Sequence, residues 1–570
     1  MSTLQKLKNA RTRSDLAKIL GVTPSGLTYA LFVIPQEAKY HKFQIPKRSG
    51  GHREISAPNS HIKLVQRRLA SKLYECTKEI ENAQPNRKKV THGFQPGRSI
   101  ITNADRHKNR RYVFNVDVKD FFDSINFGRV RGFFNKDREF LLDKEICTAI
   151  AQIACWENSL PQGSPCSPVI SNLIGHILDV KMLKLAKESK CRYTRYADDM
   201  TFSTNEREFP SSIAIRDAQD PGKWSVSTKL EGLIKQAGFE INPQKTRMQI
   251  VGSRQLATGL VVNKKVNIKE EYCRQTRAMC NHLFKKDAYF LQNTKEGEAP
   301  KLIKNLDILE GKLCHIHAVK TRVDLTDQQK KSRKFDPPPG TLRLYKKFLF
   351  YKNFFAQERP LIITEGASDI IYLRTAIRHS KKKFPLLFDK TLQIRFLKNS
   401  KTVKEVLGLG DGCGGIGKLV ATYAKEISAF GRPSAFPIII LIDNDDGSKK
   451  SIFKVAKDAA KATLKKDIEI SIESNDCWHH LGDNLYLVKV PHGGSKSPKS
   501  IEELFPEKWL KFSVDGKIFD PSKKHGDHTS LGKVAFAKKV VETHAGEIDF
   551  GGFDSLFSLI EGAIADYRKN

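Results

Sequence analysis

The adjacent carboxylates Asp198 and Asp199 are the residues of this chain whose types and spacing are best suited to chemistry. They lie in the run Arg-Tyr-Ala-Asp-Asp-Met-Thr-Phe at 195–202, where apolar residues flank both charges. Like charges this close repel each other, and in a folded protein a bound divalent cation is the usual compensation. Such a cation also stabilises the charge that moves onto phosphate oxygens during phosphoryl transfer. A lone Asp-Asp pair is more often a solvated turn, so the flanking sequence must decide.

A third aspartate, Asp117, lies in Val-Phe-Asn-Val-Asp-Val at 113–118, where apolar residues alternate as in a strand. The run 195–202 is itself hairpin-like. Three aspartates carried by two such elements could clamp two metal ions. The elements needed to position these carboxylates are therefore two strands that lie close together.

The motifs around these aspartates resemble those of reverse transcriptases, in the same order, over roughly residues 40–320. Leu-Pro-Gln-Gly-Ser-Pro at 160–165 falls between the two aspartate runs, where that family carries its template and nucleotide loop, so Gln162 is a candidate nucleotide contact. Glu-Ile-Asn-Pro-Gln-Lys-Thr at 240–246 follows, as the family's next motif does. The resemblance implies a right-handed polymerase with fingers, palm and thumb, in which Asp117, Asp198 and Asp199 bind two Mg²⁺ ions.

The same resemblance implies roles for four further residues. Lys245 is a candidate proton donor to the pyrophosphate leaving group. Phe122 would lie beneath the incoming sugar and exclude a 2′-hydroxyl, although a core phenylalanine beside Phe121 is the alternative. Lys47 and Arg53 flank a predicted hairpin with a basic tip that would hold the triphosphate, although a solvated turn would carry the same residues.

Two short elements resemble the bacterial retron type of reverse transcriptase. Asn-Ala-Asp-Arg-His at 103–107 is similar to its Asn-Ala-x-x-His element, with an ordinary polar helix start as the alternative. Ala257-Thr258-Gly259 stands where these enzymes usually carry Val-Thr-Gly, and the alanine departs from that pattern. Asn103, His107, Thr258 and Gly259 are accordingly expected at the nucleic acid. The retron resemblance implies a structured noncoding RNA as template and self-primer, a branched RNA-linked DNA product (msDNA), and antiphage defence.

From 263 to 320 the pattern becomes helical and basic, which suits a thumb. Arg274 and Arg277 are its candidate contacts to a phosphate backbone, and a solvated helix face is the alternative. Asp-Pro-Pro-Pro-Gly at 336–340 breaks helix and strand alike. We therefore expect a polymerase domain at 1–320, a linker at 321–344 and a second domain at 345–570. Near the start of the chain, residues 16–27 predict two short packed helices.

The second domain carries its own acidic residues. An apolar run at 360–364 ends in Glu365-Gly366, and a second at 436–442 ends in Asp443-Asn444-Asp445. Such continuous apolar runs are typical of parallel strands buried on both faces. Carboxylates at the carboxyl ends of parallel strands lie where α/β folds place their sites.

This half resembles the TOPRIM domain of topoisomerases, primases and OLD-type nucleases, whose hallmarks are Glu-Gly after one strand and Asp-x-Asp after another. Glu365, Asp443 and Asp445 match these motifs and would hold Mg²⁺ or Mn²⁺. The resemblance offers Asp369 and Glu503 as weaker metal ligands. It also offers Lys533 as a phosphate contact, although a helix-surface lysine would look the same.

Composition agrees with a nucleic-acid enzyme. With 98 Lys and Arg against 63 Asp and Glu among 570 residues, the net charge of +35 favours a polyanionic partner. Ten cysteines without a Cys-x-x-Cys pair argue against a zinc ribbon or a disulfide framework and suit a reducing cytosol. No apolar run reaches the roughly 18 residues that a membrane span needs. We expect a cytoplasmic protein with no membrane partner, and leave open an assembly of more than one copy.

The sequence thus predicts a multidomain α+β and α/β protein: a retron-type reverse transcriptase followed by a TOPRIM nuclease with a mainly parallel sheet. Its partners would be its noncoding RNA and msDNA, deoxynucleoside triphosphates and the nucleic acid that the nuclease cuts. One alternative is an intron-type or unclassified bacterial reverse transcriptase whose TOPRIM half manipulates or binds strands without being toxic. Another is a second half that only binds RNA, against which the intact Glu365, Asp443 and Asp445 argue.

Overall fold

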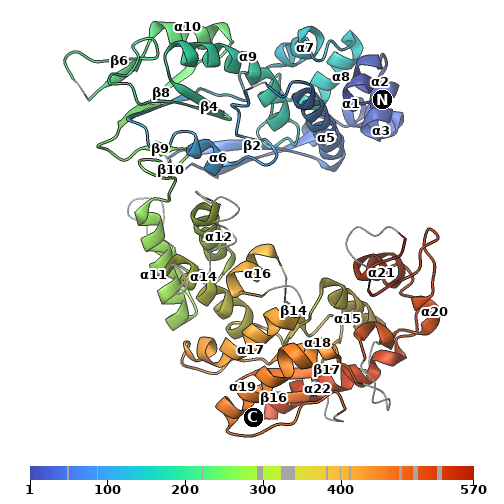
Figure 1. Ribbon diagram of the computed structural model, residues 1–570. Helices are drawn as coiled ribbons and strands as arrows, with labels where there is room; N and C mark the ends of the chain where they lie inside the picture. The colour runs from blue at the N-terminus through green and yellow to red at the C-terminus, as the bar shows by residue number, and fades with distance from the viewer. Residues whose placement is uncertain are drawn as a thin grey trace. The chain divides into compact units, whose positions relative to one another are not determined.

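The computed structural model describes residues 1–570 except 48–49, 87, 221, 292–299, 323–339, 381–382, 398–399, 410–412, 474–477, 492–498, 523–528 and 570 (Figure 1). Contacts divide the chain into two compact units, the first built from residues 1–273 and 318–332 and the second from 274–317 and 333–570. The described residues form one hydrophobic core in the first unit and two in the second.

A four-stranded antiparallel sheet lies at the centre of the first unit, in the order β4-β5-β3-β8. Its strands are β3 (Tyr112–Val118), β4 (Arg192–Tyr196), β5 (Asp199–Thr204) and β8 (Ile241–Ile250). Residues 113–116 of β3 are all buried, which is the pattern of an inner strand covered on both faces. The alternating run at 113–118 was therefore correctly predicted as a strand.

Helices surround this sheet in the first unit (Figure 1). The longest, α5 (Ser60–Ala83), buries Ile62, Val65, Leu69 and Leu73 at the three- and four-residue spacing of one helix face. The predicted pair of short helices is confirmed, and Gly21 ends the first of them in the left-handed conformation, at φ 67°. The other helical elements are α1 (Thr3–Asn9), α2 (Arg13–Leu20), α3 (Pro24–Thr28), η1 (Tyr29–Val33), α4 (Gln36–Lys39), α6 (Ile100–Asp105), α7 (Phe127–Lys136), α8 (Lys144–Ala154), α9 (Ser167–Glu188) and α10 (Thr228–Gln236).

Three small hairpins complete the first unit. The predicted basic hairpin forms from β1 (Tyr40–Pro46) and β2 (His52–Pro58), although residues 48 and 49 at its tip lie outside the described residues. The other two pair β6 (Ala214–Arg216) with β7 (Trp224–Val226), and β9 (Leu256–Ala257) with β10 (Leu260–Val261).

The second unit contains a five-stranded sheet in the order β14-β13-β15-β17-β16. Its strands are β13 (Leu361–Ile363), β14 (Arg395–Phe396), β15 (Ile438–Ile442), β16 (Trp478–Gly482) and β17 (Leu485–Lys489), and only β16 runs antiparallel to its neighbour. Alternate residues of β15 enter two different cores: Ile438 and Ile440 one, Ile439 and Leu441 the other. The predicted parallel sheet buried on both faces is confirmed.

Helices cover both faces of that sheet. The α17 and α19 helices share a core with Ile440, whereas α15 and α22 share a core with Ile439. The helical elements of this unit are α11 (Glu270–Lys286), α12 (Asp307–Arg322), α14 (Gly340–Phe350), η2 (Tyr351–Phe355), α15 (Ala367–His379), α16 (Lys401–Leu407), α17 (Cys413–Ser428), α18 (Asp446–Ser448), η3 (Lys449–Phe453), α19 (Lys454–Leu464), η4 (Ile501–Leu504), α20 (Glu507–Leu510), α21 (Lys533–Phe536), η5 (Ala537–Val541), η6 (Gly551–Phe553) and α22 (Asp554–Lys569).

The expected boundary near residue 320 differs from the packing. Leu283 of α11 and Leu313 of α12 share a core with Phe348 of α14, so residues 274–317 cluster with the second unit. Between these helices lies an unexpected hairpin of β11 (Tyr289–Leu291) and β12 (Lys301–Ile303). Most of the predicted linker at 321–344, including the Pro-rich run, lies outside the described residues.

No single described helix is long and apolar enough to cross a membrane. One bent pair, Arg13–Leu20 with Pro24–Val33 at 105°, passes the same test of length and composition when its two helices are taken together.

Candidate functional site

Two strands and one turn bring the three predicted aspartates of the first unit together. Asp117 near the end of β3 is the register partner of Asp199 at the start of β5. Ala197 and Asp198 form the turn between β4 and β5, and Ala197 adopts a left-handed φ of 57°. The backbone N–H of Val118 donates to the Asp198 carbonyl at 3.0 Å, so β3 also holds the turn. The predicted cluster therefore forms.

Burial and the charges of neighbouring aspartates raise the pKa of the Asp198 and Asp199 carboxyls. Burial, followed by the charges of Asp198 and Asp117, raises the pKa of Asp199 to about 7. Burial, followed by Asp117, also raises the pKa of Asp198, and nearby Lys245 and Arg53 only partly offset this. Carboxylates that repel one another across a strand pair form a donor set that suits hard divalent cations. Over the described residues, no three Asp, Glu, His or Cys side chains are already gathered as a metal site.

Lys245 on β8 lies at this cluster, as the sequence predicted. Its ammonium donates to both carboxylate oxygens of Asp117, at 3.0 and 3.2 Å. A shift in the β3–β8 register between Asn115 and Asp117 accompanies this placement. Because 56% of the Lys245 side chain is exposed, its ammonium can exchange Asp117 for a ligand.

The loop at 160–165 is fastened to the β1–β2 hairpin. The Ser56 N–H donates to the Gln162 carbonyl at 2.8 Å. Gly163 has a φ of 129°, and a Cβ there would lie 2.6 Å from the Ser56 carbonyl oxygen, so only glycine permits this approach. Gln162 is thereby held beside β2, the strand that carries Arg53. Lys47 lies just beyond β1, and its side chain is exposed.

The two phenylalanines that follow β3 differ in burial. Phe121 is 4% exposed and stacks on Phe239 with ring centroids 5.5 Å apart. Phe122 is only partly buried, and its ring centroid lies 6.0 Å from that of Phe94. The core position in the pair therefore belongs to Phe121, and Phe122 keeps an open side.

Asn103 and His107 are fully buried, which corrects the expectation that they touch nucleic acid. The His107 ring lies 2.8 Å from the Ser203 hydroxyl and 2.7 Å from the Thr194 hydroxyl, so it joins the segment that follows α6 to β5 and β4. Burial, followed by the nearby His92, lowers the pKa of His107 to about 3, which keeps the ring neutral. His107 therefore braces this segment against the sheet.

The β9–β10 turn packs on the same helix. Thr258 and Gly259 both have positive φ, at 47° and 80°, as a tight two-residue hairpin requires. The Thr258 hydroxyl donates to the Ile100 carbonyl of α6 at 3.0 Å, so this hydroxyl is engaged within the fold. Gly259 is exposed, and its contact to nucleic acid remains a prediction.

In the second unit, Arg274 and Arg277 both have exposed side chains on α11. That exposure is compatible with their predicted contact to a phosphate backbone, which remains a prediction.

A second acidic cluster lies at the carboxyl ends of β13 and β15. The Asp443 N–H donates to Glu365 Oε1 at 3.1 Å, so the two predicted motifs meet. Burial, followed by Glu365 and Glu502, raises the pKa of Asp443 to about 8. Asp445 accepts the Ser448 N–H at 2.8 Å and thereby caps the start of α18. Asp369 accepts the Gly366 N–H at 2.8 Å within the same edge of the sheet.

Glu502, which sequence reasoning missed, takes the place expected for Glu503. The Glu503 carboxylate accepts the Ser500 N–H at 2.9 Å and caps η4, and its side chain is exposed. Glu502 is 2% exposed and lies 3.1 Å from the Lys533 ammonium. Burial acts to lower the pKa of Lys533, but Glu502 and Asp443 outweigh it and the pKa is raised. Lys533 is thus at the cluster, and the acidic residue is one position earlier than predicted.

Known proteins match part of this chain. Residues 45–278 match the family described as reverse transcriptase (RNA-dependent DNA polymerase). The chain is 33% identical over 325 residues to a retron Mx162 reverse transcriptase of Myxococcus xanthus, covering 53% of this chain and 62% of that relative. It is 29% identical over 264 residues to a retron Ec86 reverse transcriptase of Escherichia coli, covering 45% and 74% respectively.

A solved structure is also similar to part of the chain. Apo telomerase from Candida Tropicalis, truncated from its C-terminal domain, is 16% identical with a TM-score of 0.29, covering 42% of this chain and 56% of that one.

Proposed function

We propose that this chain, whose residues 45–278 form a reverse-transcriptase domain, is an RNA-directed DNA polymerase of the retron type. The observation that carries the proposal is the meeting of Asp117, Asp198 and Asp199 at the β3 end and the β4–β5 turn. These carboxylates would hold two Mg²⁺ ions. Bound magnesium would activate the primer hydroxyl and neutralise charge on the triphosphate.

The surrounding residues suit the remaining tasks of nucleotide addition. Arg53 and Lys47 on the β1–β2 hairpin would bind the triphosphate, and Lys245 would give a proton to the departing pyrophosphate. Phe122, with its open side, would exclude a 2′-hydroxyl, while Gln162 would contact the nucleotide or its template base. The +35 charge of the chain favours an extended RNA and DNA partner.

The polymerase proposal is tested by deoxynucleotide incorporation on an RNA template with a DNA primer. Wild type should extend the primer only with Mg²⁺ or Mn²⁺ present. The rate of deoxynucleotide incorporation by Asp117→Asn should be lower by at least about 10³-fold, because the cations act directly on the reacting oxygens. Asp120→Asn is the matched control: Asp120 is exposed, and its left-handed φ of 43° suits asparagine. No extension by wild type under any metal condition would refute the proposal.

The retron reading adds a structured noncoding RNA that serves as template and self-primer, and a branched RNA-linked msDNA product. Its support is the similarity to two retron reverse transcriptases. DNA isolated from cells that express the chain with its flanking locus should migrate faster after ribonuclease or debranching treatment. DNA made without any RNA linkage would favour an intron-type or unclassified reverse transcriptase.

For the second unit we propose a metal-dependent TOPRIM nuclease that serves as a cytoplasmic effector in antiphage defence. Its support is the acidic cluster of Glu365, Asp443 and Glu502 at the carboxyl edge of a mainly parallel sheet, with Lys533 beside it. Asp443 and Asp445 would hold Mg²⁺ or Mn²⁺, Glu365 would complete the ligand set or act as base, and Asp369 would support the edge. The alternative is a strand-binding module without toxicity.

The nuclease proposal has its own test. RNA and DNA bound by the polymerase half should restrain cleavage, so that degrading the product DNA switches on metal-dependent cleavage of added nucleic acid. Glu365→Ala and Asp443→Asn should abolish that cleavage, whereas Glu503→Gln, which changes only the η4 cap, should keep it. Cleavage by the Glu365→Ala protein equal to that of wild type would refute the nuclease.

A further inference from the structure

A buried ion pair stands directly behind the turn that carries Asp198 and Asp199. Arg195 on β4 and Asp179 on α9 are 0% and 1% exposed. The guanidinium donates twice to the carboxylate, from Nε to Oδ1 and from Nη2 to Oδ2, both at 2.8 Å. This forked geometry fixes the guanidinium in position as well as in orientation.

The same guanidinium reaches the turn itself. Its Nη1 donates to the carbonyl oxygen of Ala197 at 3.0 Å, so the pair holds the backbone of the residue just before Asp198. The backbone of Arg195 is hydrogen-bonded as well. Its carbonyl accepts the His92 N–H at 2.8 Å, and its N–H donates to the Val90 carbonyl at 3.1 Å.

The acid is equally well engaged. Asp179 accepts the Tyr193 hydroxyl and the Thr91 hydroxyl, each at 2.8 Å. Burial alone would raise the pKa of Asp179, but Arg195 and these hydroxyls outweigh it and the pKa is lowered. Every oxygen of the carboxylate therefore has a donor, which is the condition under which a buried pair is tolerated.

Two glycines make room for this arrangement. A Cβ on Gly175 of α9 would lie 2.8 Å from Arg195 Nη2, and one on Gly93 would lie 2.5 Å from the Ala197 nitrogen. Asn172 completes the wall, donating to the Gly93 carbonyl at 2.7 Å. Residues of α9, of the segment at 91–93 and of β4 thus together fix the position of the turn.

Building on the proposed polymerase function, we infer that Arg195 and Asp179 are positioning residues for the catalytic turn. The carboxylates of Asp198 and Asp199 repel each other and that of Asp117 when they are ionised. This repulsion favours conformations of the turn in which the carboxylates lie further apart. A buried ion pair adds little net stability, because desolvation offsets the attraction between the charges. Its contribution is the fixed anchor at the Ala197 carbonyl, and a shift of about 1 Å in such a site can cost about 10²-fold in rate.

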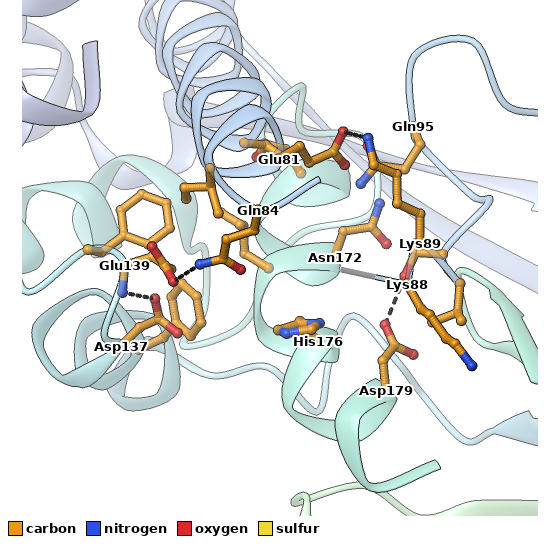
Figure 2. A pocket seen from close by; sticks show the side chains of 18 of the residues that line it. Glu81, Gln84, Lys88, Lys89, Gln95, Asp137, Glu139, Asn172, His176 and Asp179 are labelled. Atoms are coloured by element: carbon orange, nitrogen blue, oxygen red, sulfur yellow. Dashed lines mark hydrogen bonds and ion pairs between the residues drawn. The ribbon is translucent and has the colours of Figure 1, made fainter. Parts of the chain in front are cut away.

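A cavity lies beside Asp179 of this anchor (Figure 2). Its volume is about 110 Å³, and Asp179 and Asn172 of α9 line it together with Thr91. Glu139 lines it too, but its carboxylate accepts a hydrogen bond from Gln84. A small carboxylate entering this cavity can therefore reach the space vacated in an Asp179→Ala protein.

The test combines kinetics with chemical rescue. In Asp179→Ala, kcat for deoxynucleotide addition should fall about 10²-fold or more, with the KM for nucleotide and the Kd for primer–template within about threefold of wild type. Adding formate or acetate should raise the kcat of Asp179→Ala at least about tenfold. The same salts should leave the kcat of Asp198→Asn unchanged. Glu139→Gln should behave as wild type. Arg195→Lys, which loses the fork, should resemble Asp179→Ala without rescue.

Because Asp179→Ala leaves a buried guanidinium unpaired and could unfold, a second variant keeps the inference testable. Asp179→Leu with Arg195→Met removes both charges at similar volume and should melt close to wild type. Its kcat should still fall about 10²-fold, since nothing then holds the Ala197 carbonyl. A folded double variant with wild-type kcat would overturn the inference, whereas an inactive wild type would overturn the proposed polymerase instead.

Discussion

At the scale of single residues, the carboxyls of Asp198 and Asp199 are buried close to other acidic groups. Asp199 carries a pKa raised to about 7 by burial, then by Asp198 and Asp117. A group whose folded pKa lies above its unfolded value favours folding only while it is protonated. The stability associated with Asp199 is therefore complete below about pH 4 and is lost as pH rises through about 7.

This predicts a pH-dependent gain from Asp199→Asn in protein freed of divalent cations. At pH 8 the variant should be more stable than wild type by on the order of 2 kcal/mol, because asparagine is not ionised. The gain should shrink towards zero near pH 4. Calorimetric melting of the full chain in chelator at both pH values measures it, and a gain that is equal at both would contradict the raised pKa.

Phe122 gives a second residue-scale prediction. Phe122→Ala should raise ribonucleotide incorporation relative to deoxynucleotide incorporation by at least about tenfold with little change in melting temperature, because its side chain is partly open. Phe121→Ala removes a ring from the core and should instead destabilise the protein by about 3–5 kcal/mol. Unchanged sugar discrimination in Phe122→Ala, measured with competing nucleotides, would remove Phe122 from the site.

The sequence predicted site residues correctly where a motif identifies them. It failed where only the burial of a side chain in the fold decides which residue lies at the site. Asp117, Asp198 and Asp199 follow from their strand and turn pattern. Which of Glu502 and Glu503 is buried depends on how the short helix η4 is oriented. The sequence does not show this, because the two glutamates are adjacent and identical. Asn103 and His107 were expected at the nucleic acid because of the retron resemblance, yet hydroxyls on β4 and β5 satisfy His107 in the core.

At the scale of elements, the segment around α6 braces the central sheet. His107 bridges hydroxyls of β4 and β5, and Thr258 of the β9–β10 turn bonds to the helix. The two elements expected to meet nucleic acid therefore meet each other. Apolar periodicity predicted the main strands and helices well. The β11–β12 hairpin escaped prediction because its strands are only three residues long.

His107→Ala tests this brace. The substitution leaves the buried Ser203 and Thr194 hydroxyls unpaired and should cost about 2–4 kcal/mol of stability. The folded protein should bind RNA with an unchanged Kd. His52→Ala, at an exposed position, controls for removal of an imidazole. A weaker Kd for RNA with unchanged melting would restore the nucleic-acid role of His107.

At the scale of the whole molecule, two units carry two acidic clusters on two different sheets. The antiparallel sheet of the first holds Asp117 and Asp199, and the mainly parallel sheet of the second holds Glu365 and Asp443. From the sequence we predicted a linker at 321–344 because of its Pro-rich run at 336–340. The sequence could not show that apolar faces of α11 and α12 join the core of α14, because their partners lie far along the chain.

Separate sheets predict separable activities. Asp443→Asn should abolish cleavage and leave deoxynucleotide incorporation within about twofold of wild type, because no residue of its cluster belongs to the first unit. Both assays are run on the same purified chain. Loss of incorporation in Asp443→Asn without loss of folding would show that the two clusters serve one reaction.

The most direct test of the account is DNA synthesis on an RNA template by the Asp198→Asn, Asp199→Asn double variant beside wild type. The double variant should fold, bind primer–template with a Kd near that of wild type, and incorporate no measurable deoxynucleotide, since the carboxylates that would hold the catalytic cations are gone. Incorporation by the double variant at the rate of wild type would contradict the assignment of this turn as the centre of an RNA-directed DNA polymerase.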